Sequence, residues 1–340
     1  MTISRLLKNT YLSKSPFRPP LQRGKEGDFS NASGPFIKAF WTSPKGVLHQ
    51  RSLKQVALDC LCLCKVKISF FASLSAATGL LLTGRPPGAG LFALFTGVFL
   101  MACGACALNH YQERKTDALM ARTAGRPMPA GRIEPGRALC FAITLVCSGC
   151  AVLMSTGTLA APLLGLFAVL WYNGFYTWLK TRTAFAVIPG ALVGAIPPAI
   201  GWIAGGGSLL DPRLAAFSFF FFMWQVPHFF IHLLAFGKEY EEAGLPSLTM
   251  VFTGAQLDRL TFQWILATAA SLQLVGLFGL IQSPLVQISL LVVSLWLAVQ
   301  GVNFMKGHEQ GYISIFKRTN YFMLIVMLLI FIDKLPHFVF

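Results

Sequence analysis

The stretch LFALFTGVFLMACGACAL, Leu91–Leu108, is an apolar run without a single charged residue. At roughly 18 residues it is long enough to cross a hydrocarbon core of about 30 Å as a helix. In lipid each backbone polar group needs a partner within the chain, so a spanning run of this kind must be helical. The stretch therefore predicts a membrane-spanning helix.

Further apolar blocks repeat this pattern along the chain. Of the 340 residues, 55% are hydrophobic and only 12% are charged, whereas soluble domains carry about a quarter charged residues. The predicted spans are Ile68–Thr83, Leu91–Leu108, Leu139–Met154, Leu159–Trp178, Phe185–Ala204, Leu214–Phe236, Phe262–Ile281, Leu285–Val302 and Tyr321–Ile332. The sequence thus predicts an all-α polytopic membrane protein with about nine transmembrane helices.

The net charge of +15 is explained by topology and not by nucleic acid. Residues 1–67 hold 12 of the 28 Lys and Arg residues against 3 acids. With the N-terminus inside, the inward loops carry 13 of the remaining 16, as the positive-inside rule expects. We therefore expect the lipid bilayer, and no nucleic acid, as a partner.

The chain divides into a basic N-terminal extension, residues 1–60, and a transmembrane domain, residues 61–340. The extension is rich in Pro, Gly, Ser, Lys and Arg, without sustained apolar periodicity, which predicts disorder. Its Arg-rich, acid-poor composition also allows a mitochondrial transit peptide. Pro16, Pro19 and Pro20 would interrupt the amphipathic helix of such a peptide. A bacterial cell (inner) membrane is the expected location, and the mitochondrial inner membrane is the alternative.

Polar side chains gather directly after the first quoted run, in ALNHYQERKTDALMARTAGRPMPAGR, Ala107–Arg132. Asn109, Glu113 and Asp117 are four residues apart, so on a helix their oxygens line one face. Such a row suits Mg²⁺, which takes oxygen ligands and usually shares them with substrate phosphates. A solvated helix end held by i,i+4 pairs would explain the charge, but not the row.

Arg122 and Arg126 follow this row and suit an anionic group. The two long hydrophilic loops, Tyr111–Arg137 and Gly237–Leu260, both face the inside in the predicted topology and hold seven of the 13 acids. Two acidic clusters on one side of the membrane indicate one shared site, reached from that side.

The row of Asn109, Glu113 and Asp117, followed by Arg122 and Arg126, resembles the first motif of the UbiA-type intramembrane prenyltransferases. Three other stretches resemble one branch of them, the protohaem IX farnesyltransferases or haem O synthases. They are WYNGFYTWLKTRT (Trp171–Thr183), GALVGAIPPAIGW (Gly190–Trp202) and WQVPHFFIHLLAFGKEYEEAGLPSL (Trp224–Leu248). The likeness extends over about residues 60–335. It implies nine transmembrane helices around a central cavity, with Mg²⁺ and a prenyl diphosphate donor.

Within that branch, the resemblance implies transfer of a farnesyl group from farnesyl diphosphate to a vinyl group of haem B, giving haem O. It implies Mg²⁺ held by Asn109, Glu113 and Asp117 with Glu239 from the facing loop. The family usually has Asp where Glu113 stands, which alters the reach of the ligand and keeps its charge. A haem A synthase or a terminal-oxidase assembly factor is the protein partner that the resemblance implies.

The resemblance also implies roles for residues outside this predicted metal site. The resemblance makes Lys180 a catalytic diphosphate ligand, although a lysine at a span end is also a common snorkelling anchor. The resemblance also implies that the following residues bind substrate: Arg122, Arg126, Tyr172, Tyr176, Trp224, Gln225 and His228. His228 lies within WQVPHF, the block typical of the haem branch, and His232 lies outside that block.

Two other functions remain open from the sequence. The same fold acts on aromatic quinone precursors in relatives, which usually carry an Asp-rich second motif in place of WQVPHF. A membrane transporter without chemistry is the other alternative, but the sequence has no clear internal repeat of the kind transporters often show.

Overall fold

The computed structural model describes residues 52–86, 88–306 and 311–334. The N-terminal segment up to residue 51, with its alternatives of extension and transit peptide, lies outside the described residues. The described chain belongs to one compact unit that begins at Ser52. Its regular elements, within the described residues, are all helical, which confirms the predicted all-α class.

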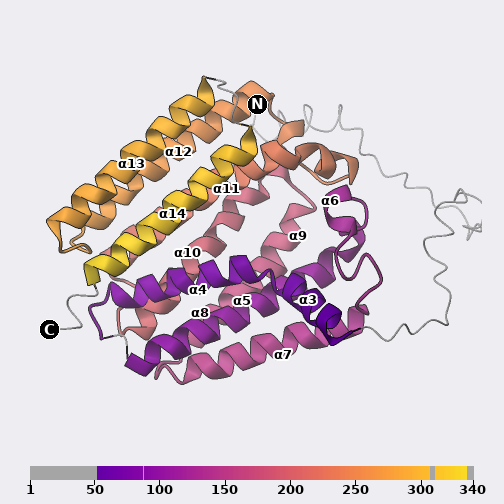
Figure 1. Ribbon diagram of the computed structural model, residues 1–340, viewed down its shortest axis with the longest axis horizontal. Helices are drawn as coiled ribbons and strands as arrows, with labels where there is room; N and C mark the ends of the chain where they lie inside the picture. The colour runs from indigo at the N-terminus through magenta and orange to yellow at the C-terminus, as the bar shows by residue number, and fades with distance from the viewer. Residues whose placement is uncertain (1–51, 87, 307–310, 335–340) are drawn as a thin grey trace, which may run out of the picture. The chain divides into compact units, whose positions relative to one another are not determined.

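Each predicted apolar block overlaps at least one helix, and several helices extend beyond their block (Figure 1). The helices are α3 (Leu53–Cys64), α4 (Val66–Leu81), α5 (Gly88–Asp117), α6 (Ala121–Ala124), α7 (Pro135–Met154), α8 (Ala160–Val169), η1 (Leu170–Tyr176), α9 (Thr177–Lys180), η2 (Ala184–Ala186), α10 (Val187–Ala204), α11 (Pro212–Glu242), η3 (Leu248–Met250), α12 (Gly254–Leu277), α13 (Pro284–Met305) and α14 (Tyr312–Lys334). Several begin with Pro at the first helical position, where its missing N–H costs nothing.

Seven helices of the described chain are long and apolar enough to cross a membrane, and the bent pair α3 and α4 brings the number to eight. The sequence predicts about nine. The difference lies in the block Leu159–Trp178, where α8, η1 and α9 follow one another without a break but are each short. The middle segment, η1, is π-helical. The chain is an integral membrane protein with multiple spans.

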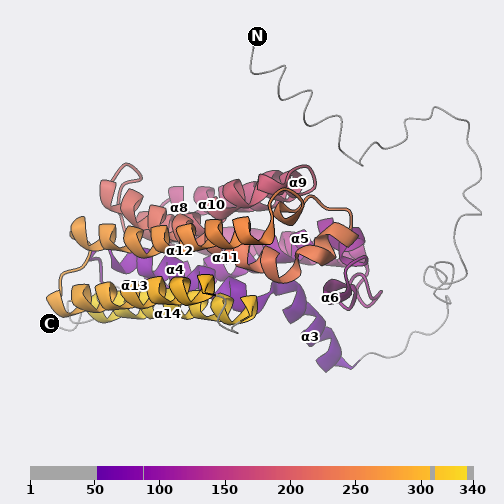
Figure 2. The ribbon, with the colours of Figure 1, turned by 90° about the horizontal axis from the view of Figure 1, so that it is seen from above.

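The junction of α3 and α4 is a bend of 51° at Lys65. Lys65 has φ 43° and ψ 52°, the left-handed conformation that few non-glycine residues adopt. Figure 2 shows α3 leaving the line of α4 at this point. The side chain of Ser52 caps α3, and Arg132 Nε lies 2.9 Å from Asp59 Oδ1. The described residues begin at Ser52, so they include the last part of the predicted extension, which ends at residue 60.

Two groups of helices are joined by α10 and α11 (Figure 1). On one side α5 packs against α4 and α7, and on the other side α12, α13 and α14 pack in sequence. Helix α10 contacts α4, and α11 contacts α12 and α14. Large buried side chains such as Trp202, Phe217, Phe220 and Phe322 fill the second side. This arrangement brings α5, α10 and α11 around a common interior.

Helices α4 and α10 pack so closely that glycines of each helix lie directly against the backbone of the other. A Cβ atom at Gly201 would overlap the carbonyl oxygen of Ala76, and one at Gly79 would overlap that of Pro198. Small residues allow such close packing between membrane helices, where dispersion forces replace the hydrophobic effect. The glycines therefore fix the position of α10 against the first span.

Candidate functional site

A cavity of about 670 Å³ opens among α4, α5, η1, α10, α11 and α14. Every site residue predicted from the sequence lines it, with the exception of Glu239. Its volume falls in the range of sites that bind small molecules. Aliphatic and aromatic side chains such as Val98, Met101, Ile200 and Phe221 line its interior. One polar end is therefore joined to a long apolar interior.

The polar end is built on the last turns of α5. This helix continues without interruption from the apolar span to Asp117, so Asn109, Glu113 and Asp117 all reach the cavity. Asn109 and Asp117 are buried, being 3% and 1% exposed. The face-sharing row that the sequence predicts is present in the structure.

Each member of the row has a cationic partner. Lys65 Nζ donates to Asn109 Oδ1 at 3.1 Å, and Lys180 Nζ donates to Glu113 Oε1 at 3.0 Å. The guanidinium of Arg126 donates to both carboxylate oxygens of Asp117, at 2.8 and 2.7 Å. Three cations thus surround two carboxylates, and the excess of positive charge favours an anionic ligand.

Lys65 is a site residue that the sequence analysis missed. It lines the cavity from the bend between α3 and α4, and its partner Asn109 is 44 positions away. The only local signal is its place directly before the first apolar span. The left-handed backbone at Lys65 is the feature that sets the direction of the lysine relative to α4.

Glu239 lies beside the cavity and not in its lining. Its Oε2 accepts a hydrogen bond from the backbone N–H of Arg122 at 3.2 Å. The guanidinium of Arg122, 5.0 Å from the ring centre of Phe236, also packs on α11. The two predicted acidic loops therefore meet, with Glu239 holding the segment that carries Arg122.

The donor set suits a magnesium ion shared with a phosphate. Among the described residues, no three His, Cys, Asp or Glu side chains come together in a metal-holding group. Two carboxylates and one amide oxygen on α5 line the cavity, and a metal ion bound there would replace some of their present cationic partners. Mg²⁺ commonly takes one or two carboxylates and completes its shell with water and substrate phosphates. The residues present fit that mode of binding.

Aromatic rings form the wall next to Lys180. Tyr172 and Tyr176 are stacked with centroids 5.8 Å apart, and Tyr176 stacks on Phe229 at 5.9 Å. A Cβ atom at Gly190 would lie 2.5 Å from the ring of Tyr176, so glycine leaves the space for this ring. The Lys180 ammonium lies 5.2 Å from the ring centre of Tyr240.

The π-helical segment η1 is held against α5 by a reciprocal amide contact. Asn173 Nδ2 donates to Gln112 Oε1 at 3.1 Å, and Gln112 Nε2 donates to the Asn173 carbonyl oxygen at 2.9 Å. Asn173 also donates to the carbonyl oxygen of Ala105 at 3.0 Å. π-Turns occur frequently at functional sites. This one carries the two tyrosines.

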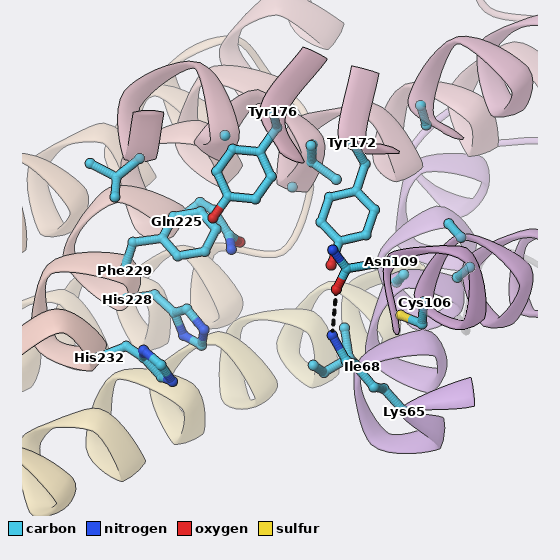
Figure 3. A pocket seen from close by; sticks show the side chains of 18 of the residues that line it. Lys65, Ile68, Cys106, Asn109, Tyr172, Tyr176, Gln225, His228, Phe229 and His232 are labelled. Carbon is cyan, nitrogen blue, oxygen red and sulfur yellow. Dashed lines mark hydrogen bonds between the residues drawn. The ribbon is translucent and has the colours of Figure 1, made fainter. Parts of the chain in front are cut away.

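His228 and His232 lie across the cavity from Asn109 and Lys65 (Figure 3). The ring of His228 is 4.6 Å from that of Phe316 on α14, and its Nδ1 lies 3.1 Å from Asn320 Oδ1. Asn320 also lines the cavity and was missed, because its place depends on contact between α11 and α14.

The neighbours of His228 on α11 are fixed in different ways. Trp224 Nε1 donates to the Thr319 carbonyl oxygen at 3.0 Å, again on α14. Gln225 occupies space that a Cβ atom at Gly194 would fill, since that atom would lie 2.7 Å from Gln225 Oε1. Trp224 and His228 are thus held by α14, whereas Gln225 packs against α10.

The model of the UbiA prenyltransferase family matches residues 70–326. The chain belongs to this family. It is 37% identical over 223 residues to a Geobacter sulfurreducens protein named protoheme IX farnesyltransferase, covering 65% of this chain and 81% of the relative. An Oleidesulfovibrio alaskensis protein of the same name is 31% identical over 272 residues, covering 80% of this chain and 94% of the relative. The predicted family is confirmed.

A solved structure of another family member shares the fold. It is a UbiA homolog from Archaeoglobus fulgidus bound to GPP and Mg²⁺, with a TM-score of 0.61 and 16% sequence identity. The match covers 81% of this chain and 99% of that one. This likeness confirms the helical architecture that the sequence predicts.

Proposed function

We propose that the chain is a protohaem IX farnesyltransferase, which transfers a farnesyl group from farnesyl diphosphate to a vinyl group of haem B and yields haem O. The names of its relatives support this proposal. The observation that carries it is a single cavity lined by both the carboxylate row of α5 and the histidine-bearing wall of α11. Such a cavity offers a place for the diphosphate donor and a place for the macrocyclic acceptor.

The donor would bind at the polar end. Asn109, Glu113 and Asp117 would hold Mg²⁺, assisted by Glu239 through the loop that it positions. When bound there, Mg²⁺ would supply positive charge to the departing diphosphate. Preorganised charge aimed at a leaving group is commonly the largest catalytic contribution.

Cationic side chains would stabilise the rest of the leaving group. Lys180, Arg122 and Arg126 line the same end and can exchange their present partners for phosphate oxygens. Tyr172 and Tyr176 bound this space with stacked rings. Their π-faces would shield the positive allylic carbon from water.

The reaction breaks the bond between C1 of the farnesyl group and the diphosphate oxygen, which leaves with the electron pair. The terminal vinyl carbon of haem B forms a new bond to C1, and positive charge passes to the adjacent carbon. A water oxygen bonds there and one water proton is released. The chain orients the two reactants and excludes other water through the apolar lining.

The acceptor would lie against α11 and α14. The rings of Trp224 and His228 line one part of the cavity, and Phe316 packs against the ring of His228. Aromatic faces can pack a macrocycle, and a histidine can offer one nitrogen to iron or a propionate. Gln225, which lines the cavity beside Gly194 of α10, would add a hydrogen-bonding group.

A product assay tests this proposal. Purified protein in lipid nanodiscs would receive haem B, farnesyl diphosphate and Mg²⁺, and the haem product would be identified by mass. We expect haem O, formed only when all three are present. Prenylation of an aromatic quinone precursor in place of haem B would contradict the proposal.

The proposed location is a bacterial cell membrane, with Tyr111–Arg137 and Gly237–Leu260 in the cytoplasm. On a background without native cysteines, Arg137→Cys and Glu242→Cys should resist impermeant labelling from outside. Leu210→Cys, at a side chain that is 93% exposed beyond α10, should label. Labelling of either loop from outside would contradict this orientation.

A further inference from the structure

His110 is a buried histidine of the cavity to which none of the contacts described above assigns a role. It is 1% exposed and lines the cavity from α5. Neither ring nitrogen has a hydrogen-bond partner among the described residues. A buried polar group without a partner costs free energy, so such groups are normally satisfied by protein, water or ligand. The partner of His110 is therefore expected to come from the cavity.

The surroundings of His110 are those of the carboxylate row. It follows Asn109 in the chain and precedes Glu113 by three residues, so it lies on the neighbouring face of α5. The charged groups that act on its ring are Lys65, Arg126 and Glu113. Two of these are cations, and the carboxylate already pairs with Lys180. This corner of the cavity attracts an anionic ligand.

We infer that His110 donates a ring N–H to a phosphate oxygen of the bound prenyl diphosphate, beside Lys65 and Arg126. This inference rests on the proposed function and adds a binding residue to it. A neutral imidazole carries one N–H donor and one acceptor nitrogen. Phosphate oxygens accept hydrogen bonds, so the N–H is matched while the second nitrogen remains open to water.

Haem B, the proposed acceptor, also carries anionic groups, its propionates, which could accept a hydrogen bond from His110. Its expected wall, with His228 and His232, lies across the cavity from Asn109 and Lys65 (Figure 3). The immediate neighbour of His110 is instead Asn109, the first member of the row. The position therefore favours the donor over the acceptor.

Two substitutions separate a hydrogen-bond donor from a packing residue. His110→Leu keeps much of the volume and removes both nitrogens, whereas His110→Asn keeps an N–H donor in a shorter side chain. Affinity for farnesyl diphosphate with Mg²⁺ would be measured by titration calorimetry, without any acceptor. We expect His110→Leu to weaken binding roughly five- to a hundred-fold, and His110→Asn to remain within about threefold of wild type.

Leu94→Ala is the matched control for a changed buried side chain on α5. Leu94 is fully buried and does not line the cavity. This variant should lose thermal stability and keep its affinity for farnesyl diphosphate. If His110→Leu does not fold, His110→Ala takes its place with the same expected loss of affinity.

Unchanged farnesyl diphosphate affinity in a folded His110→Leu or His110→Ala protein would overturn the inference. A higher KM for haem B with unchanged donor affinity would also overturn it, and would assign His110 to the acceptor. Because the titration contains no acceptor, its result does not depend on the identity of the product. If the wild-type protein makes no haem O, the proposed function is contradicted. If His110→Leu nevertheless weakens farnesyl diphosphate binding relative to that wild-type protein, this inference still stands.

Discussion

The ammonium nitrogen of Lys180 lies 3.0 Å from Oε1 of Glu113, so one ion pair joins α9 to α5 across 67 positions of sequence. The two side chains are only 19% and 13% exposed. Removing one partner of such a buried pair leaves an uncompensated charge. A metal ion bound by Glu113 would compete with this ion pair, and the Lys180 ammonium, with its three N–H donors, would then be free to donate to the diphosphate.

Lys180→Met should reduce kcat for haem O formation by about 10²–10³-fold, because the leaving group loses one of its stabilising charges. Lys180→Arg should retain more than a tenth of the activity. Arg182→Met is the matched control, since Arg182 packs over Trp178 at 4.5 Å and does not line the cavity. Equal losses in Lys180→Met and Arg182→Met would contradict a specific role for Lys180.

Glu113→Gln and Asp117→Asn should each abolish turnover, because each replaces a carboxylate of the proposed magnesium site by a neutral amide. Glu113→Asp should stay active, since it shortens the side chain and keeps the charge. Chelation with EDTA should stop turnover in the wild-type protein, and added Mg²⁺ should restore it. Thermal unfolding must accompany these assays because Asp117→Asn also leaves Arg126 without its carboxylate partner. Wild-type turnover in a folded Glu113→Gln protein would exclude Glu113 as a necessary ligand.

Lys65→Asn should lower the affinity for farnesyl diphosphate by about tenfold, since it removes a cation from the polar end. Asparagine is among the residues that tolerate the left-handed conformation found at this position, so the bend should persist. Lys65→Arg restores the charge and should recover most of the affinity. Equilibrium binding of farnesyl diphosphate is the measurement, and equal affinity in both variants would argue against an electrostatic role.

His228→Ala should raise the KM for haem B roughly five- to a hundred-fold, because it removes a polar group from the proposed acceptor wall. Farnesyl diphosphate affinity should stay within about threefold. Asn320→Leu should have a smaller effect in the same direction, since Asn320 orients the ring through its contact with Nδ1. His232→Ala should do less than His228→Ala. Loss of donor affinity in His228→Ala with unchanged haem binding would reverse this assignment.

Much of the fold could be predicted from the sequence because a lipid environment leaves few choices. Apolar runs of sufficient length must be helical, and the row on α5 depends only on spacing within one helix. Asn109, Glu113 and Asp117 could therefore be placed on one face before any tertiary contact was known. Lys65 and Asn320 could not, because they reach the cavity through contacts 44 and 92 positions away in sequence.

Local helix geometry also limited the prediction of the fourth span. Hydropathy marks Leu159–Trp178 as a single apolar block but does not distinguish α-helical from π-helical hydrogen bonding. The side-chain amides of Gln112 and Asn173, on different elements, hold the π-helical part in place. Such a pairing becomes visible only when α5 and η1 lie side by side.

The π-helical segment η1 sets the rotational phase of everything that follows it in its span. A π-turn closes with an i→i+5 hydrogen bond and so accommodates one more residue than an α-turn, and one residue of α-helix corresponds to a rotation of about 100°. The extra residue in this segment therefore rotates the residues that follow it about the helix axis, and Lys180 then faces Glu113. Deletion of Leu170 should abolish turnover by turning Lys180 away from its partner, whereas Leu170→Ala, at a side chain that is 68% exposed, should leave turnover unchanged. The end of this span that carries Lys180 is thus aligned by residue count as well as by residue identity.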